Sequence, residues 1–304
     1  MECGAEWAYY NAQRHITIRN AGNPRRAPAL ITPATPAPHP ADKTNMESAM
    51  AHWIRYEHQG RAGFGVLENG SIRIHTGDMY TDAQATGATL ALAAVKVLTP
   101  AQPSKMVALW NNFHALAAKL GNPVPPEPLY FLKANNSFLA HGETIRAPAS
   151  YSGKVVYEGE LGIVIGRRCT AVSEAQAPGC IFGYTCINDV TAAEILNRDA
   201  TFAQWARAKS FDTFGVFGPV VATGLDPSKL TVRTILNGQE RQNYPVADMI
   251  FPPARLVSLI SQDMTLEPGD VIACGTSLGV GSMKPGSSVS IVIDGIGTLS
   301  NRYE

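Results

Sequence analysis

The sequence lacks an excess of either charge and lacks long apolar runs. Its 25 Lys and Arg residues balance its 25 Asp and Glu residues, and no block of like charges occurs, which argues against nucleic acid as the main partner. No apolar run approaches the roughly 20 residues that span a bilayer, so we expect no membrane partner. The hydrophobic content of 45% is ordinary for a globular protein and predicts a packed core.

Cysteine is scarce and has no C-x-x-C spacing. This pattern argues against a zinc or redox site and is typical of reduced packing residues in a cytoplasmic protein, which is the location we expect. The cysteines are Cys3, Cys169, Cys180, Cys186 and Cys274.

Residues 1–48 differ in composition from the rest of the chain. Prolines are frequent between residues 28 and 40, and few residues there could build a core, so we expect a disordered tail. The arginines up to Arg26 keep a mitochondrial transit peptide as an alternative, although two early glutamates argue against it. A third interpretation is a mis-assigned start, with translation beginning at Met46 or Met50.

Residues 49–102 are expected to form a small N-terminal β subdomain. Apolar and polar residues alternate in Trp53–Tyr56 and in Gly63–Leu67, which is typical of half-buried strands. Asn69-Gly70 suits the type I′ turn of a hairpin, with Ser71–His75 as the returning strand.

An Ala-rich stretch and a second domain follow. Ala88–Val97 predicts a helix, and two prolines then mark a boundary. Residues 103–304 are expected to form the larger, catalytic domain. It opens with a strand at Met106–Trp110 and a helix within Asn111–Gly121 that is closed by its C-terminal glycine.

Strands dominate the remainder of this domain. Helices are expected at Ala192–Arg207 and Pro253–Met264, and Asn237-Gly238 predicts another hairpin. Because the helices are few and separated, the sequence predicts a mixed α+β, β-rich and mostly antiparallel fold. Its further strands are expected at Val155–Ile165, Ile181–Ile187, Val216–Ala222, Leu230–Leu236, Val271–Cys274 and Val289–Ile293.

Two carboxylates interrupt the apolar strand Val155–Ile165. Side chains two residues apart point to the same face of a strand, so Glu158 and Glu160 should project together. Neighbouring carboxylates near a core repel each other and require a cation. A hard divalent ion is one candidate, with Asp189 as a third ligand, and solvation on an exposed edge is the alternative.

Five short motifs together resemble the fumarylacetoacetate hydrolase family, over about residues 105–301. The resemblance implies a β-rich roll, usually paired into a homodimer, and a Mg²⁺ or Mn²⁺ ion bound by Glu158, Glu160 and Asp189. The motifs, in chain order, are Phe131-Leu132-Lys133, Glu158-Gly159-Glu160-Leu161, Asn188-Asp189-Val190-Thr191, Ala208-Lys209-Ser210-Phe211-Asp212 and the glycine-rich Gly275–Gly281.

The resemblance also implies a chemistry. A 2-oxo acid, or its 2-hydroxy-enoate form, can chelate the ion, which then stabilises an enolate as a Lewis acid. This intermediate serves hydrolysis of carbon–carbon bonds, isomerisation and decarboxylation, as in the catabolism of aromatic or sugar acids. The residues expected to take part are Lys209 and Thr276 in catalysis and Asn112, Lys133 and Gly275 in substrate binding.

The segment Asn111–Gly121 departs from the family pattern. Hydrolytic members carry Arg-Asn-Tyr followed by a His-x-x-Glu pair on a lid helix, where the pair activates water. Here only Asn112 of the first motif is kept, and the pair falls at Leu116 and Lys119. His114 lies two positions earlier and is the candidate base, since histidine titrates near neutral pH.

Three other functions remain open at this stage. The first is a lyase of the ureidoglycolate type, and the second is a non-catalytic, metal-dependent relative that binds sugar acids. The third is a structural β protein whose carboxylates are merely solvated. Turnover of a 2-oxo acid that depends on a divalent ion would favour an enzyme over the non-catalytic relative and the structural β protein.

Overall fold

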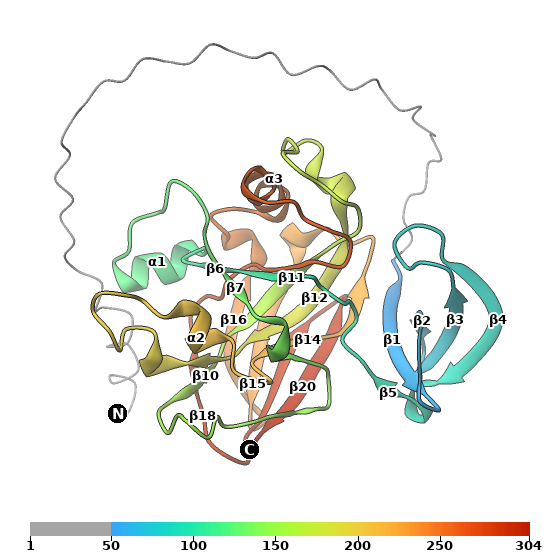
Figure 1. The fold of residues 1–304 in the computed structure, drawn as a ribbon, viewed down its shortest axis with the longest axis horizontal. Coiled ribbons are helices and arrows are strands. Elements are labelled where there is room, and N and C mark those ends of the chain that lie inside the picture. Colours follow the sequence, from blue (N-terminus) through green and yellow to red (C-terminus); the bar gives the residue numbers. More distant parts are fainter. Residues whose placement is uncertain (1–49) are drawn as a thin grey trace, which may run out of the picture.

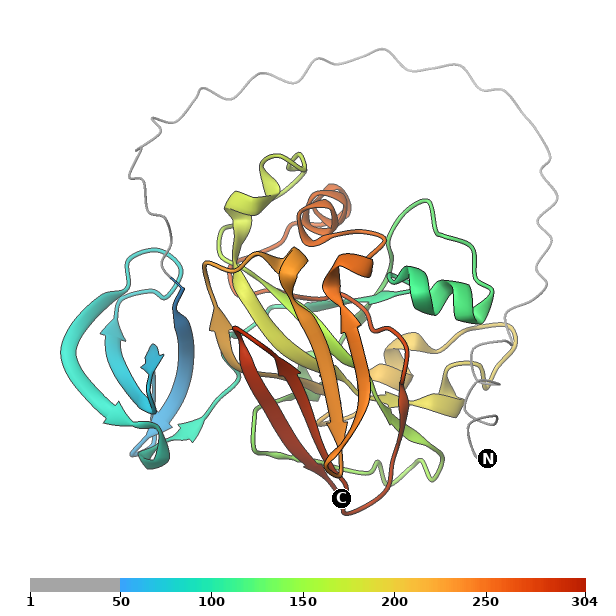
Figure 2. The same cartoon turned by 180° about the vertical axis from the view of Figure 1, so that it is seen from behind.

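The computed structural model describes residues 50–304 (Figure 1). The expectations of a tail, a transit peptide or a mis-assigned start therefore concern residues outside the described part. A lobe of antiparallel strands stands beside a larger β body, and helices α1 (His114–Leu120) and α2 (Trp205–Lys209) lie on the side of the body away from the lobe (Figures 1 and 2). No helix within residues 50–304 is long and apolar enough to span a membrane.

The largest sheet runs through both the lobe and the body. Strand β1 joins them because His52 and Trp53 pair with Ala222 and Val221. Its 12 strands are, in spatial order, β4 (Gln84–Ala91), β3 (Ser71–Thr76), β2 (Arg61–Glu68), β1 (His52–His58), β14 (Gly215–Ala222), β12 (Ile181–Asp189), β11 (Gly159–Ile165), β17 (Val271–Ala273), β6 (Met106–Trp110) and β7 (Leu129–Lys133), with β5 (Lys96–Val97) beside β1 and β8 (Phe138–Leu139) beside β14.

Two smaller sheets complete the body. A five-stranded sheet packs on β11, β12 and β14, with the core between them formed by side chains such as Ile163, Val216 and Ile291. The five strands are β16 (Gln239–Pro245), β15 (Thr231–Leu236), β19 (Ser288–Ile293), β20 (Gly297–Tyr303) and β9 (Thr144–Ile145), and the third sheet contains β13 (Thr191–Ala192), β10 (Val155–Tyr157) and β18 (Gly281–Met283). Helix α3 (Pro253–Asp263) lies in the chain between the strand pairs β15–β16 and β19–β20, both of which belong to the five-stranded sheet.

The predicted β-rich α+β architecture is confirmed, together with most of its turns. Asn69-Gly70 and Asn237-Gly238 have positive φ at both residues, as a type I′ hairpin turn requires. Helix α1 is closed by Gly121, which adopts the left-handed conformation with φ 68°. Glycine adopts this conformation without a clash because it has no Cβ. Helix α3 matches the amphipathic helix expected at Pro253–Met264.

Two predicted helices are wrong. Ala88–Val97 forms the end of β4, a 3₁₀ turn and β5, because Thr89 and Ala91 pair with β3, and this pairing overrides the helix propensity of alanine. Ala192–Arg207 begins as strand β13, and α2 starts only at Trp205. Between them the Asp199 carboxylate accepts a bond from the Thr201 N–H at 2.8 Å, a local bond that competes with helix formation.

The predicted strand Val155–Ile165 is divided at Glu158. β10 pairs with β13 and β18, whereas β11 pairs with β12 and β17. The Glu158 N–H donates to the Asn188 side-chain oxygen at 3.0 Å instead of joining a ladder. The chain therefore changes sheets at the first carboxylate of the pair.

Candidate metal centre

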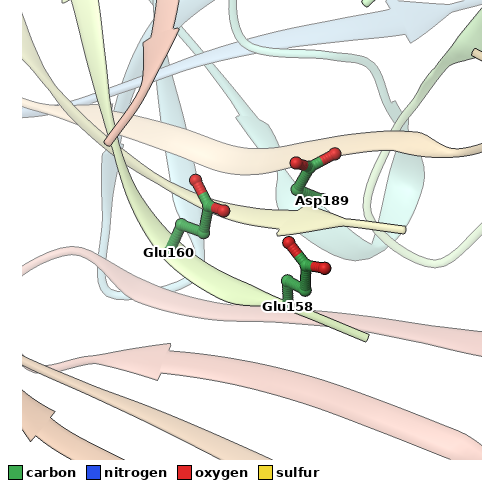
Figure 3. Close-up of side chains that lie close together, drawn as sticks. All are labelled: Glu158, Glu160 and Asp189. Carbon is green, nitrogen blue, oxygen red and sulfur yellow. The ribbon is translucent and has the colours of Figure 1, made fainter. Parts of the chain in front are cut away.

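The three predicted carboxylates converge in the middle of the β body. Glu158 and Glu160 come from the junction of β10 and β11, Asp189 ends β12, and their side chains point toward one space (Figure 3). One oxygen of each carboxylate lies within 4.8 Å of the others. Their exposed fractions are 5%, 0% and 0%, so solvation at an exposed edge cannot explain the group.

Two buried lysines neutralise part of this charge. Lys209 Nζ donates to Glu158 Oε2 at 2.7 Å and to Asp189 Oδ2 at 2.6 Å. Lys133 Nζ donates to the other oxygen of Asp189 and to the Val190 carbonyl. Both lysines are almost completely buried, so Lys209 is not the surface lysine that residue type alone would favour.

Of the three carboxylates, Glu160 is the one that forms no ion pair with any residue from 50 to 304. Its Oε2 accepts a bond from the Gly275 N–H at 2.9 Å. Its Oε1 is buried and has no hydrogen-bond partner among residues 50–304. A buried, unpartnered carboxylate oxygen is costly, so it indicates a missing cation or donor at this point.

The pKa values of the carboxylates follow from these partners. Burial, and then the charges of Asp189 and Glu158, raise the pKa of Glu160 well above its usual value. Burial also raises the pKa of Glu158, although Lys209 opposes it. For Asp189 burial acts in the same direction, but Lys133 and Lys209 outweigh it and lower the pKa.

The lysines respond to the same charges in opposite ways. Burial lowers the pKa of Lys133 more than the Asp189 charge raises it. Burial would also lower the pKa of Lys209, but three carboxylates surround it and raise the pKa above its usual value. Lys209 therefore keeps its proton and acts as a fixed cation.

The residues fit a hard divalent ion. Three carboxylates face two ammonium groups, which leaves one negative charge and the unpartnered Glu160 oxygen. A carboxylate oxygen can accept a hydrogen bond and still bind a metal through its other lone pair, so the lysine bonds do not block Asp189. Oxygen ligands of this kind suit Mg²⁺ and Mn²⁺. The ligands would be Glu158, Glu160 and Asp189.

The turn after β17 supports this group from one side. The Gly275 N–H bonds to Glu160, and the Thr276 hydroxyl donates to the Gly159 carbonyl at 2.9 Å. Gly275 has φ 88°, and a Cβ there would lie 3.3 Å from the Asn112 Cβ. Asn112 itself bonds only to backbone, donating to Cys274 O and accepting from Phe251 N. In this structure the Gly275 N–H, the Thr276 hydroxyl and the Asn112 side chain thus form their hydrogen bonds with other groups of the protein.

His114 is not brought into this cluster. It begins α1 with an exposed side chain and makes no hydrogen bond or ion pair with any residue from 50 to 304. The helix is anchored, because Leu116 and Leu120 are buried in the core and the Ala115 N–H donates to Asp248 at 3.0 Å.

Four residues near the carboxylates had no role in the sequence-based interpretation. The Asn188 side chain accepts a bond from the Glu158 N–H, and the Thr191 hydroxyl donates to Glu158 Oε1. Both residues belong to the Asn-Asp-Val-Thr motif, which was the signal in the sequence that could have indicated them. Gln242 accepts from the Gly159 N–H and donates to Thr276, and the Tyr244 hydroxyl donates to Gly159 O. The last two lie in a polar stretch of β16 that gives no hint of burial.

The family models that match cover almost the whole described chain. One, described as "Fumarylacetoacetate (FAA) hydrolase C-terminal", matches residues 105–304. The chain belongs to the fumarylacetoacetate hydrolase family. A second model, "Rv2993c-like, N-terminal", matches residues 51–100. The resemblance inferred from the five motifs is thereby confirmed.

Relatives of this family include enzymes of different reactions. The oxaloacetate tautomerase YisK of Bacillus subtilis is 36% identical over 69% of this chain and 74% of its own length. The 2-hydroxyhepta-2,4-diene-1,7-dioate isomerase of Mycobacterium marinum is 38% identical with a TM-score of 0.76, covering 83% of this chain and 98% of the other.

A third relative was solved with ligands. The maleylpyruvate hydrolase of Sphingobium sp. SYK-6, in complex with manganese(II) and pyruvate, is 26% identical with a TM-score of 0.68, covering 83% of this chain and 98% of that one. Mn²⁺ is therefore bound in a solved structure of this family. This protein is an enzyme of the family, and it has an acidic group able to hold a metal.

Replacing Glu160 with glutamine tests the metal centre. Glu160→Gln keeps the shape but removes the charge, so we expect Mn²⁺ affinity in calorimetric titration to fall by at least about 100-fold, because loss of supporting residues alone costs about 10–100-fold. Glu174→Gln is the matched control, since Glu174 is exposed. Unchanged Mn²⁺ affinity of Glu160→Gln would contradict the assignment.

The raised pKa values of Glu158 and Glu160 predict how metal binding stabilises the protein at different pH values. Between the usual and the raised pKa, the metal-free folded state holds protons that the unfolded state has released, so its stability falls as pH rises. Bound metal removes this penalty. We expect the increase in Tm caused by Mn²⁺ to grow as the pH rises from the usual pKa of a glutamate toward the raised pKa values of these two residues. A pH-independent increase would contradict this view.

Proposed function

We propose that the protein isomerises a 2-oxo acid between its keto and enol forms, with a divalent ion as cofactor. The observation that carries this proposal is the buried group of Glu158, Glu160 and Asp189 with the protonated Lys209 at its side. Such a group combines a site for a metal and a fixed positive charge, which together stabilise an enolate. Mg²⁺ and Mn²⁺ both suit the ligands.

The chain's own residues have separate tasks in this proposal. A bound divalent ion supplies Lewis-acid stabilisation of the enolate. Lys209 keeps its proton and donates a hydrogen bond to the substrate oxygen that gains charge. Lys133 orients Asp189 and, as a second buried ammonium, favours an anionic substrate.

The turn at residues 275–277 is the proposed binder of the substrate carboxylate. The Ser277 hydroxyl is buried and has no hydrogen-bond partner among residues 50–304. Backbone N–H groups in such a turn can bind an anion together with a hydroxyl. Thr276 takes part through this turn, although its hydroxyl proton is donated to Gly159. Asn112 and Gly275 maintain the shape of the turn.

Isomerisation is preferred over hydrolysis because of helix α1. Hydrolysis requires a base that deprotonates water, an effect worth about 10²–10⁴-fold. The residues at the positions of the usual pair are Leu116, which is buried in the core, and Lys119. Moving a proton between carbon and oxygen of the substrate also needs a group that takes the proton from one atom and returns it to the other, but that group does not have to activate water. The relative named a tautomerase and the relative named an isomerase support the same choice.

Hydrolysis with His114 as the base is the second candidate. His114 stands on the same segment as the usual histidine, and its ring is exposed and makes no hydrogen bond with any residue from 50 to 304, so no such bond holds its ring nitrogens. The relative that is named a hydrolase favours this candidate.

Two further features belong to the proposal. We infer a homodimer, on the basis of the family resemblance. We also infer a cytoplasmic enzyme of acid catabolism, in keeping with the described cysteines, Cys169, Cys180, Cys186 and Cys274, which are free and buried.

Replacing Lys209 with methionine tests the catalytic charge. Lys209→Met keeps most of the aliphatic stem, so we expect turnover of the Mn²⁺-loaded enzyme to fall by roughly 10²-fold or more, the effect of losing one oxyanion donor. Mn²⁺ binding should survive, because the three carboxylates remain. The screen covers oxaloacetate, acylpyruvates and 2-hydroxy-dienedioates. Lys229→Met, at a lysine with 81% side-chain exposure, is the control, and wild-type turnover by Lys209→Met would overturn this role.

Replacing His114 with alanine separates the two candidate reactions. For isomerisation, we expect His114→Ala to keep the rate within about twofold and to leave the pH profile unchanged, since no water needs activation. For hydrolysis, the same variant should lose most activity together with the acidic limb of the profile. The measurement is the pH dependence of kcat/KM with oxaloacetate enol and with an acylpyruvate, and loss of oxaloacetate isomerisation would contradict our proposal.

A further inference from the structure

An aromatic cavity lies beside the carboxylate group. Its volume is about 240 Å³, and it is formed by the end of β6, by β7 and by the start of α2. Within residues 50–304 its lining contains no charged side chain and consists of Trp110, Leu129, Tyr130, Phe131 and Trp205. The sequence-based interpretation gave none of these five residues a role of its own.

Two elements connect this cavity directly to the metal centre. On β7, Phe131 and Lys133 are two residues apart and therefore share a face, and Lys133 reaches Asp189. On α2, Trp205 and Lys209 are one turn apart and also share a face. Lys209 Nζ lies 5.2 Å from the centre of the Phe131 ring and 2.7 Å from Glu158 Oε2. One side chain thus touches both the carboxylates and the cavity wall.

The cavity wall is made of flat surfaces. Phe131 and Trp205 are stacked with ring centres 5.2 Å apart and an angle of 22°, and Trp110 and Trp205 are 5.3 Å apart. These three side chains are only partly buried. Aromatic faces favour stacking with another flat group. A cavity of about 150 Å³ is known to hold benzene, so the present volume suits one ring with a short attachment.

The charge at the edge of the cavity disfavours an anion. The Tyr130 hydroxyl donates to Asp263 Oδ2 at 3.0 Å, so a carboxylate lies at the Tyr130 end of the cavity. Lys209, whose Nζ lies 5.2 Å from the Phe131 ring centre, is already bonded to Glu158 and Asp189. A dioic substrate would place its distal carboxylate in an apolar, partly negative environment, which is unfavourable.

We propose that the cavity binds the end of the substrate that lies away from the metal, and that this end is a flat, uncharged aromatic or conjugated group. The inference rests on the proposed function, since it takes the 2-oxo acid end to lie at Glu158, Glu160 and Asp189. The substrate class is then a 2-oxo acid with an aryl or similar substituent, and dioic acids bind less well.

Three ligands that share the same 2,4-dioxo acid end test this proposal by calorimetry on the Mn²⁺-loaded full chain. Their distal groups are phenyl, methyl and carboxylate. We expect the phenyl compound to bind at least about tenfold more tightly than the other two, as burial of a ring predicts. Trp205→Ala and Trp110→Ala should each reduce phenyl binding by about tenfold or more, and methyl binding much less. Phe202→Ala, at an aromatic residue with 72% exposure, is the matched control and should preserve the preference.

The outcomes separate the cavity from the metal centre. Equal affinity for phenyl and methyl in the wild type, tighter binding of the dioic compound, or an unchanged phenyl preference in both tryptophan variants would overturn the cavity proposal while the proposed function stands. If oxalate, which needs only the metal centre, also fails to bind the Mn²⁺-loaded chain, the proposed function fails and the inference fails with it. Trp205 lies on α2 together with Lys209, so Trp205→Ala alone would not distinguish a loss of the cavity wall from a displacement of Lys209. Trp110→Ala makes this distinction, because Trp110 lies on β6.

Discussion

The rest of the structure depends on the pairing of three buried carboxylates with two buried ammonium groups. Removing one partner of a buried ion pair typically costs about 3–5 kcal/mol, because the other charge is left uncompensated. Lys209 bridges Glu158 and Asp189, and Lys133 holds the second oxygen of Asp189. Within the described residues, Glu160 accepts a hydrogen bond from the Gly275 N–H alone. The remaining negative charge has no compensation within residues 50–304, and a divalent ion is the compensation that these oxygen ligands favour.

The division of the strand at Glu158 is part of this arrangement. Since the chain leaves one sheet and enters another there, the N–H groups of Glu158 and Gly159 lose their ladder partners. The side chains of Asn188 and Gln242 accept bonds from these N–H groups instead, so no buried backbone donor remains unsatisfied at this point. In an uninterrupted strand these two consecutive N–H groups would point to opposite edges and bond to the neighbouring strands on either side. The supporting amides are therefore as necessary to the position of the carboxylates as the strands are.

Local signals in the sequence were sufficient for most of the turns and strands and for the three carboxylates that lie together. The Asn-Gly pairs, the apolar alternation and the Glu-x-Glu and Asn-Asp-Val-Thr motifs each lie within a few residues. The sequence could not indicate that Lys133 and Asp189 meet, because they are far apart in the chain, or that Gln242 is buried within a polar strand. The errors at Ala88–Val97 and Ala192–Arg207 have a similar cause. There, pairing with distant strands and an Asp199 bond outweighed local helix propensity.

Chemistry and substrate choice are separable in this architecture. Any change to Glu158, Asp189 or Lys209 disturbs a balance of buried charges, and the cost falls on folding as well as on activity. The cavity residues Trp110 and Trp205 carry no charge and are partly exposed, so a substitution there affects mainly packing and ligand contact. Because Lys209 touches both regions, a new cavity shape can present a different substrate to an unchanged metal centre. Under this proposal, relatives named as a tautomerase, an isomerase and a hydrolase would differ in the region around the charged core and not within it.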